Sequence, residues 1–85
     1  MNNTTSGPVE IWLRRDSLQV ICCIVNEDES TYGRPVDSLS MRGAQREIGG
    51  YLIAGGLWPD GLWTVEATDD NGAAIEAWRR FTPPA

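Results

Sequence analysis

The sequence contains no histidine, and it has only two cysteines. Histidine is the commonest general acid–base group and a frequent metal ligand, so its absence removes the most accessible route to both functions. Two thiols cannot form a structural zinc site with the usual ligand spacing. Cys22 or Cys23 would also need a neighbouring base to act as a nucleophile, and no motif supplies one. We therefore expect no enzyme activity, no catalytic residue, no metal and no cofactor.

Long apolar runs are also missing. No stretch of 18 apolar residues could span a bilayer. The first eight residues, MNNTTSGP, have neither the charged nor the apolar region of a signal peptide. We expect a cytoplasmic protein without a membrane partner.

Lysine is absent as well, and all seven basic residues are arginines. This composition fits a GC-rich coding genome, whose codons favour arginine over lysine. The net charge of −5 argues against a general nucleic-acid binder and against an anionic membrane surface. The two cysteines are adjacent, which disfavours a bridge between them in a strand, so both are expected to be core residues.

The 85 residues are enough for one small domain. We expect an N-terminal tail at 1–8, a single α+β domain at 9–81 and a C-terminal tail at 82–85. Residues 9–15 alternate apolar and polar side chains, as a strand with one buried face does. Residues 18–25 are apolar on both faces, which indicates a strand covered from both sides.

Two further strands, WTVEAT and AAIEAWRRF, flank an Asp-Asn-Gly hairpin signal. A two-residue turn would pair Val65 with Trp78. A three-residue loop with its glycine left-handed would pair Val65 with Ala77 and Ala67 with Ile75. The second register keeps smaller apolar residues together, so it is preferred.

The middle of the chain predicts one helix. It begins at Leu39 with Asp37 or Ser38 as its cap, and it stops at Gly55-Gly56. The polar run at 26–37 reads as a loop, and residues 57–61 read as a connector with turn chemistry. The expected apolar stripe consists of Met41, Ala44, Ile48, Leu52 and Gly55.

Three interior glycines, Gly43, Gly49 and Gly50, each cost about 1 kcal/mol relative to alanine in a helix. They suggest that another backbone, from the sheet or from a partner chain, comes close to the helix. A short, irregular helix is the alternative.

The expected order is β-β-α-β-β, a four-stranded antiparallel sheet with one helix packed on one face. The first strand, VEIWLRR, and the last, IEAWRRF, share a pattern in which Glu, Trp and Arg alternate. An antiparallel pairing would make these strands neighbours, in the order 2-1-4-3, and set opposite charges around a tryptophan pair. The expected cross-strand pairs are Glu10 with Arg80, Trp12 with Trp78, and Arg14 with Glu76.

This tryptophan-bearing face is the candidate binding site. Because one helix cannot cover two sheet faces, either a second copy of the chain or the loop at 26–37 should cover it. The first possibility predicts a homodimer that acts by binding protein, its partners being itself and another protein. The alternative function is single-stranded nucleic-acid binding, in which Trp12 and Trp78 stack on bases beside Arg14 and Arg80.

Two other surfaces are secondary. Arg42 and Arg46 lie four residues apart on the predicted helix and could contact phosphates. The acidic runs at 27–29 and 69–70 could face a basic partner, although acidic loop runs are commonly just solvated. The glycine-rich segment at 43–56 follows no strand and lacks the Gly-Lys-Ser/Thr ending of a phosphate-binding loop.

The segment RGAQREIGGYLIAGGLWPDGLWTVEA, together with the closing AWRRF, resembles small, functionally unassigned proteins of actinobacteria and their phages. The resemblance covers about half of the chain. It implies a small accessory protein, of a kind that a phage could encode and direct at a host protein. It carries no catalytic or binding residue over to this chain.

Overall fold

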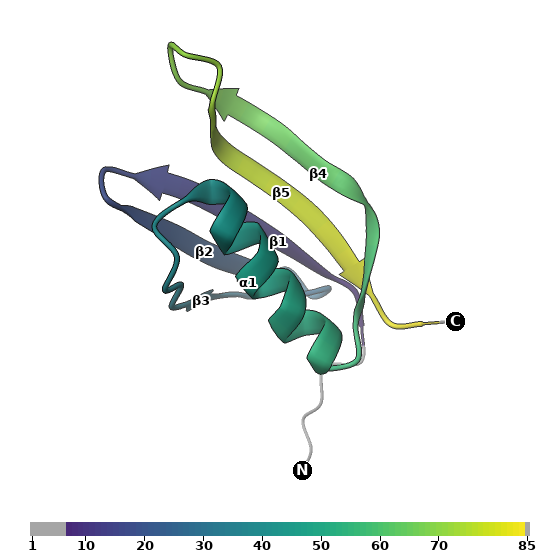
Figure 1. The fold of residues 1–85 in the computed structure, drawn as a ribbon. Coiled ribbons are helices and arrows are strands. Elements are labelled where there is room, and N and C mark those ends of the chain that lie inside the picture. The colour runs from purple at the N-terminus through teal and green to yellow at the C-terminus, as the bar shows by residue number, and fades with distance from the viewer. Residues whose placement is uncertain (1–6, 85) are drawn as a thin grey trace.

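The computed structural model describes residues 7–84, which form one α-helix packed against a five-stranded antiparallel sheet (Figure 1). The predicted α+β class and the single helix are confirmed, but the prediction of four strands was wrong. The elements are β1 (Val9–Asp16), β2 (Gln19–Val25), β3 (Thr31–Arg34), α1 (Met41–Ala54), β4 (Trp58–Thr68) and β5 (Ala74–Thr82).

The additional strand is β3, which lies in the segment that was expected to be a loop. It pairs with β2 at the edge of the sheet, with Cys23 opposite Gly33 and Val25 opposite Thr31. Four residues with a central glycine carry no apolar alternation, so the sequence pattern gave no sign of a strand. This segment extends the sheet instead of folding over it.

The strand order is β3-β2-β1-β5-β4, so the first and last long strands are neighbours as predicted. All three expected cross-strand pairs between β1 and β5 are present in the predicted register. The predicted order of the four long strands is therefore confirmed, with β3 added beside β2.

Strand β4 begins at Trp58, so the prediction of a connector at 57–61 was wrong. Pro59 is tolerated because β4 is an edge strand, where a missing N–H need not break the ladder. Gly61 has φ of +80°, and the pairing with β5 shifts between Asp60 and Thr64. The turn chemistry therefore makes a bulge within the strand.

The β4–β5 hairpin follows the preferred register in part. Val65 is opposite Ala77, and Gly72 is left-handed with φ of +84°. The expected pairing of Ala67 with Ile75 is wrong, because a second register shift after Val65 sets Ala67 opposite Glu76.

The helix begins two residues later than predicted. Its cap is Ser40, whose side chain accepts a hydrogen bond of 3.0 Å from the Gly43 backbone N–H. Asp37 and Ser38 are not the cap; their backbone N–H groups donate to the carboxylate of Glu47 instead.

The end of the helix is at the predicted glycines. Gly56, with φ of +97°, lets its own N–H reach the Ile53 carbonyl and the Leu57 N–H reach the Leu52 carbonyl. These two bonds form a Schellman cap, which satisfies carbonyl groups left free at the last turn.

The core lies between α1 and one face of the sheet. The helix contributes Met41, Ala44, Ile48 and Leu52, as its apolar stripe predicts, whereas Gly55 is exposed at the cap. The sheet contributes Val9, Ile11, Leu13, Val20, Cys22, Ile24, Ala77 and Phe81. Leu57, just after the helix, completes this cluster.

The interior glycines do not mark a close backbone approach. A Cβ atom at Gly49 would lie 4.0 Å from the ring of Phe81, which is an ordinary contact. A Cβ atom at Gly50 would have nothing within 4 Å, and one at Gly43 would meet the side chains of Ser38 and Ser40. The explanation by a close sheet backbone is therefore wrong for these three positions.

The C-terminal tail is shorter than expected where the structure describes it. Thr82 belongs to β5, so the C-terminal tail does not begin there. The N-terminal tail expected at 1–8 lies mostly outside the described residues.

Candidate binding face

Helix α1 lies across one face of the sheet (Figure 1), and no other helix is present within residues 7–84. We call the opposite side the outer face. Side chains alternate between the two faces along each strand, so the residues between the buried positions of β1 and β5 belong to the outer face. These are Glu10, Trp12, Arg14, Glu76, Trp78 and Arg80, the six predicted site residues.

Two stacked tryptophans occupy the centre of the outer face. The rings of Trp12 and Trp78 have centroids 5.7 Å apart and an interplanar angle of 22°. Each indole N–H donates to a carboxylate: Trp12 to Glu10 at 2.8 Å and Trp78 to Glu66 at 2.7 Å. Both rings remain partly exposed. The orientation of the pair is thus set by hydrogen bonds within the chain.

Charged residues flank the tryptophans on both sides. Glu10 lies opposite Arg80, and Arg14 lies opposite Glu76, so each cross-strand neighbour has the opposite sign. Arg80 also lies 3.9 Å from the carboxylate of Asp60 on β4. Arg14 and Arg80 are exposed, whereas Glu10 and Glu76 are half-buried.

Strand β2 adds an apolar column to the same face. Its register with β1 sets Val25 opposite Glu10, Cys23 opposite Trp12, and Ile21 opposite Arg14. Ile21 is 41% exposed, and the other two are half-buried. β2 was expected to be covered on both sides. The described residues cover its inner face but not its outer face.

The two cysteines consequently have different environments. Cys22 is in the core with 2% of its surface exposed, but Cys23 lies on the outer face, so the prediction that both are core residues was wrong for Cys23. Burial raises the pKa of the Cys22 thiol to about 11, and the adjacent Cys23 adds to the shift.

Two acidic members of the outer face were not predicted as site residues. Glu66 lies in the predicted strand WTVEAT and was assigned no role, yet it accepts the hydrogen bond of Trp78. Asp60 was assigned to a turn, yet it pairs with Arg80 across the strands. Both positions depend on the bulges of β4, which strand alternation alone does not reveal.

The secondary candidates, Arg42 and Arg46, are exposed on α1. The helix packs on the other side of the sheet, so these arginines do not join Arg14 and Arg80 in a common surface (Figure 1). Arg79 does not join them either, since its Nε donates to the Gly61 carbonyl at 2.7 Å.

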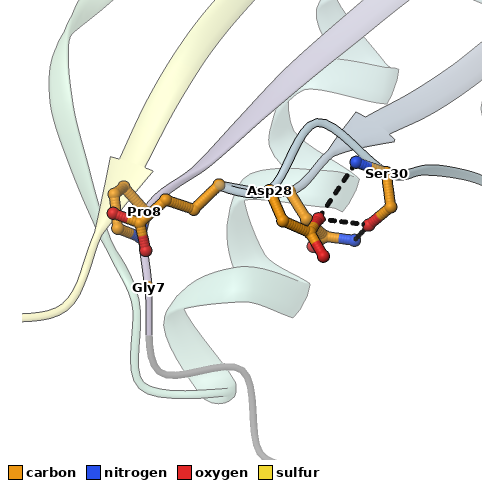
Figure 2. Close-up of a pocket in the computed structure, with 6 residues that line it drawn as sticks. Gly7, Pro8, Asp28 and Ser30 are labelled. Carbon is orange, nitrogen blue, oxygen red and sulfur yellow. Dashed lines mark hydrogen bonds between the residues drawn. The ribbon is translucent and has the colours of Figure 1, made fainter.

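Glu27 and Asp28 of the first acidic run line part of a shallow hollow of about 440 Å³ beside the start of β1, shown in Figure 2. Within it, the carboxylate of Asp28 accepts hydrogen bonds from the side chain and the backbone N–H of Ser30. These bonds lower the pKa of Asp28. The carboxylate closes its own turn, and no group of three potential metal ligands occurs within residues 7–84.

The second acidic run caps the β4–β5 hairpin in a similar way. Asp69 accepts hydrogen bonds from the backbone N–H groups of Ala73 and Asn71, which lower its pKa. Its carboxylate also lies 3.3 Å from Arg15. One carboxylate in each acidic run, Asp28 and Asp69, therefore has local structural partners.

One apolar cleft of about 340 Å³ lies between the end of α1 and the sheet. Tyr32 and Tyr51 line it, both 46% exposed, and the guanidinium of Arg34 lies 3.5 Å from the centre of the Tyr51 ring. This cation–π contact fixes β3 to the helix. The cleft offers aromatic walls without a convergent set of polar groups.

Comparisons with protein-family models, with curated proteins and with solved structures found no match. The resemblance to actinobacterial and phage proteins therefore stays a prediction. In the described part of the chain, α1 is too short to cross a membrane, and no longer apolar helix occurs.

Proposed function

We propose that this protein is a non-enzymatic binding module that forms a homodimer through the outer face of its sheet. The observation that carries the proposal is the stacked Trp12–Trp78 pair on a sheet face that no described element covers. Such a module fits the small accessory protein that the sequence resemblance implies, and a host protein is then its further partner.

The physical basis is apolar surface left in water. The tryptophan pair and the β2 column of Ile21, Cys23 and Val25 adjoin one another across β1. Burying apolar surface contributes about 25 cal/mol per Å², so a patch of this kind favours association. A two-fold interface buries the same patch on both copies at once.

Nucleic-acid binding is less well supported by the same geometry. Both indole N–H groups are held by carboxylates, and one side of each ring faces the other tryptophan. Three glutamates, Glu10, Glu66 and Glu76, share the face with two arginines. A phosphate backbone would meet more acidic than basic groups there.

Sedimentation at micromolar concentration tests the proposal. The wild-type protein should have about twice the mass of the chain. Trp78→Glu should give a monomer, because it places a carboxylate beside Glu66 at the centre of the face. Leu39→Glu is the matched control: Leu39 is 70% exposed just before α1, so the same charge change should leave the dimer intact.

A monomeric wild-type protein would refute the homodimer. The nucleic-acid alternative would gain support if a mixed single-stranded oligonucleotide bound at low salt, with affinity falling steeply as salt rises. In that case Trp78→Ala should weaken binding by about 1 to 3 kcal/mol.

A further inference from the structure

We infer that the two copies pack face to face with their strands antiparallel, about a two-fold axis that runs across the strands along the Trp12–Trp78 row. This inference rests on the proposed homodimer and specifies how its second copy is seated. The structure supports it through the arrangement of charges and apolar residues on the outer face.

The outer face has three rows that cross the strands, with neighbouring rows about 7 Å apart. The middle row contains Cys23, Trp12, Trp78 and Thr64. The row on one side contains Val25, Glu10, Arg80 and Asp60. The row on the other side contains Ile21, Arg14 and Glu76.

Glutamate and arginine therefore alternate around the tryptophan pair, with like charges only on the diagonals. A two-fold axis along the middle row brings Glu10 of one copy over Arg14 of the other, and Arg80 over Glu76. Every central charge then meets the opposite sign, which favours this register over its competitors.

Oblique packing, in which the strands of the two copies cross at an angle, is the first competitor. An axis along either diagonal brings the two like charges on that diagonal over themselves: Glu10 over Glu10 with Glu76 over Glu76, or Arg14 over Arg14 with Arg80 over Arg80. Since like charges repel across an interface, the charge pattern disfavours this arrangement.

An axis parallel to the strands is the second competitor. It also matches the four central charges, but it brings the β2 column over β4 of the other copy. Cys23 would then face Thr64, and Val25 would face the exposed carboxylate of Asp60. The axis across the strands instead brings β2 over β2, so that Val25 meets Ile21 and the apolar column covers itself.

The acidic residues of β4 do not disfavour an axis that runs across the strands. Asp60 is paired with Arg80, and Glu66 accepts the hydrogen bond of Trp78, so both are engaged within their own chain. Both are also exposed on the edge strand β4, where charges remain hydrated.

Two charge-swapped variants test the arrangement without changing the net charge. The first is Glu10→Arg with Arg80→Glu, and the second is Arg14→Glu with Glu76→Arg. Each keeps opposite signs across β1 and β5 within the chain, because the swapped residues are direct cross-strand neighbours. The inferred dimer, however, would now set like charges against each other between the copies.

Each variant alone should dimerise at least about tenfold more weakly than the wild type in sedimentation equilibrium. Mixing the two variants should restore association as a heterodimer, and combining all four substitutions in one chain should restore the homodimer. This restoration cannot be explained by damaged folding, because the combined chain has also lost the Glu10 acceptor of Trp12.

Three outcomes separate the proposals. A monomeric wild-type chain would overturn both the homodimer and its arrangement. A wild-type dimer that persists in each swapped variant would overturn the arrangement alone, as an axis parallel to the strands or another interface predicts. Swapped variants that stay monomeric when they are mixed would likewise overturn it.

Discussion

Trp12 and Trp78 stack at 5.7 Å although they come from opposite ends of the chain, because β1 and β5 are neighbours in the sheet. Aromatic pairs of this kind contribute about 0.5 to 1.5 kcal/mol beyond their buried area. We predict a coupling free energy of that size in a double-mutant cycle with Trp12→Leu and Trp78→Leu. Denaturant unfolding, at a concentration that keeps all four proteins monomeric, measures it.

The stack should also give an exciton couplet in the circular dichroism spectrum, which either single substitution removes. Additive effects of the two substitutions, together with an unchanged spectrum, would show that the rings do not interact in solution.

A second prediction concerns the two thiols. Cys23 on the outer face should react with a maleimide in dilute native protein, whereas Cys22 should react only on unfolding. Burial and a pKa of about 11 keep Cys22 protonated and inaccessible near neutral pH. Cys22→Ala and Cys23→Ala identify which thiol each labelling phase represents.

The rate at Cys23 should fall as the protein concentration rises, because pairing of two outer faces would cover it. Equal labelling rates of the two thiols in the native protein would contradict their assignment to opposite faces.

A third prediction uses the glycines of the helix. Gly50→Ala should raise the free energy of unfolding by about 0.5 to 1 kcal/mol, because alanine is the better helix former and nothing lies within 4 Å of the added Cβ. Gly56→Ala should lower it by about 1 to 2 kcal/mol, because φ at this position is +97°. Chemical denaturation of both variants against the wild type measures the contrast.

Loss of stability or of dimerisation in Gly50→Ala would indicate that a chain packs against α1. The proposed interface does not predict such a contact, since α1 lies on the other side of the sheet.

The sequence was most informative where periodicity is regular. Alternation in β1 and β5, and the shared pattern of Glu, Trp and Arg, predicted their pairing in the correct register. The apolar spacing of Met41, Ala44, Ile48 and Leu52 predicted the core face of α1. These segments are long enough for a period of 2 or of 3.6 residues to be distinguished.

The sequence was least informative where backbone irregularity decides the structure. The four residues of β3 are too few and too polar to show a period. Pro59 and Gly61 read as a turn because their local preferences are the same in a turn and in a bulged edge strand. The cap at Ser40 was missed because two other good capping residues, Asp37 and Ser38, precede it closely.

The same irregularities determine whether the edge strands of the sheet can pair with strands of other molecules. One edge strand is β3, which has only four residues and therefore few unpaired backbone groups with which another strand could pair. The other is β4, whose register is shifted at more than one point and whose Pro59 has no N–H to donate. Neither edge strand is a good template for adding strands from other molecules. Growth into fibres is therefore disfavoured in the plane of the sheet, and a copy seated on the outer face would end the assembly instead of propagating it.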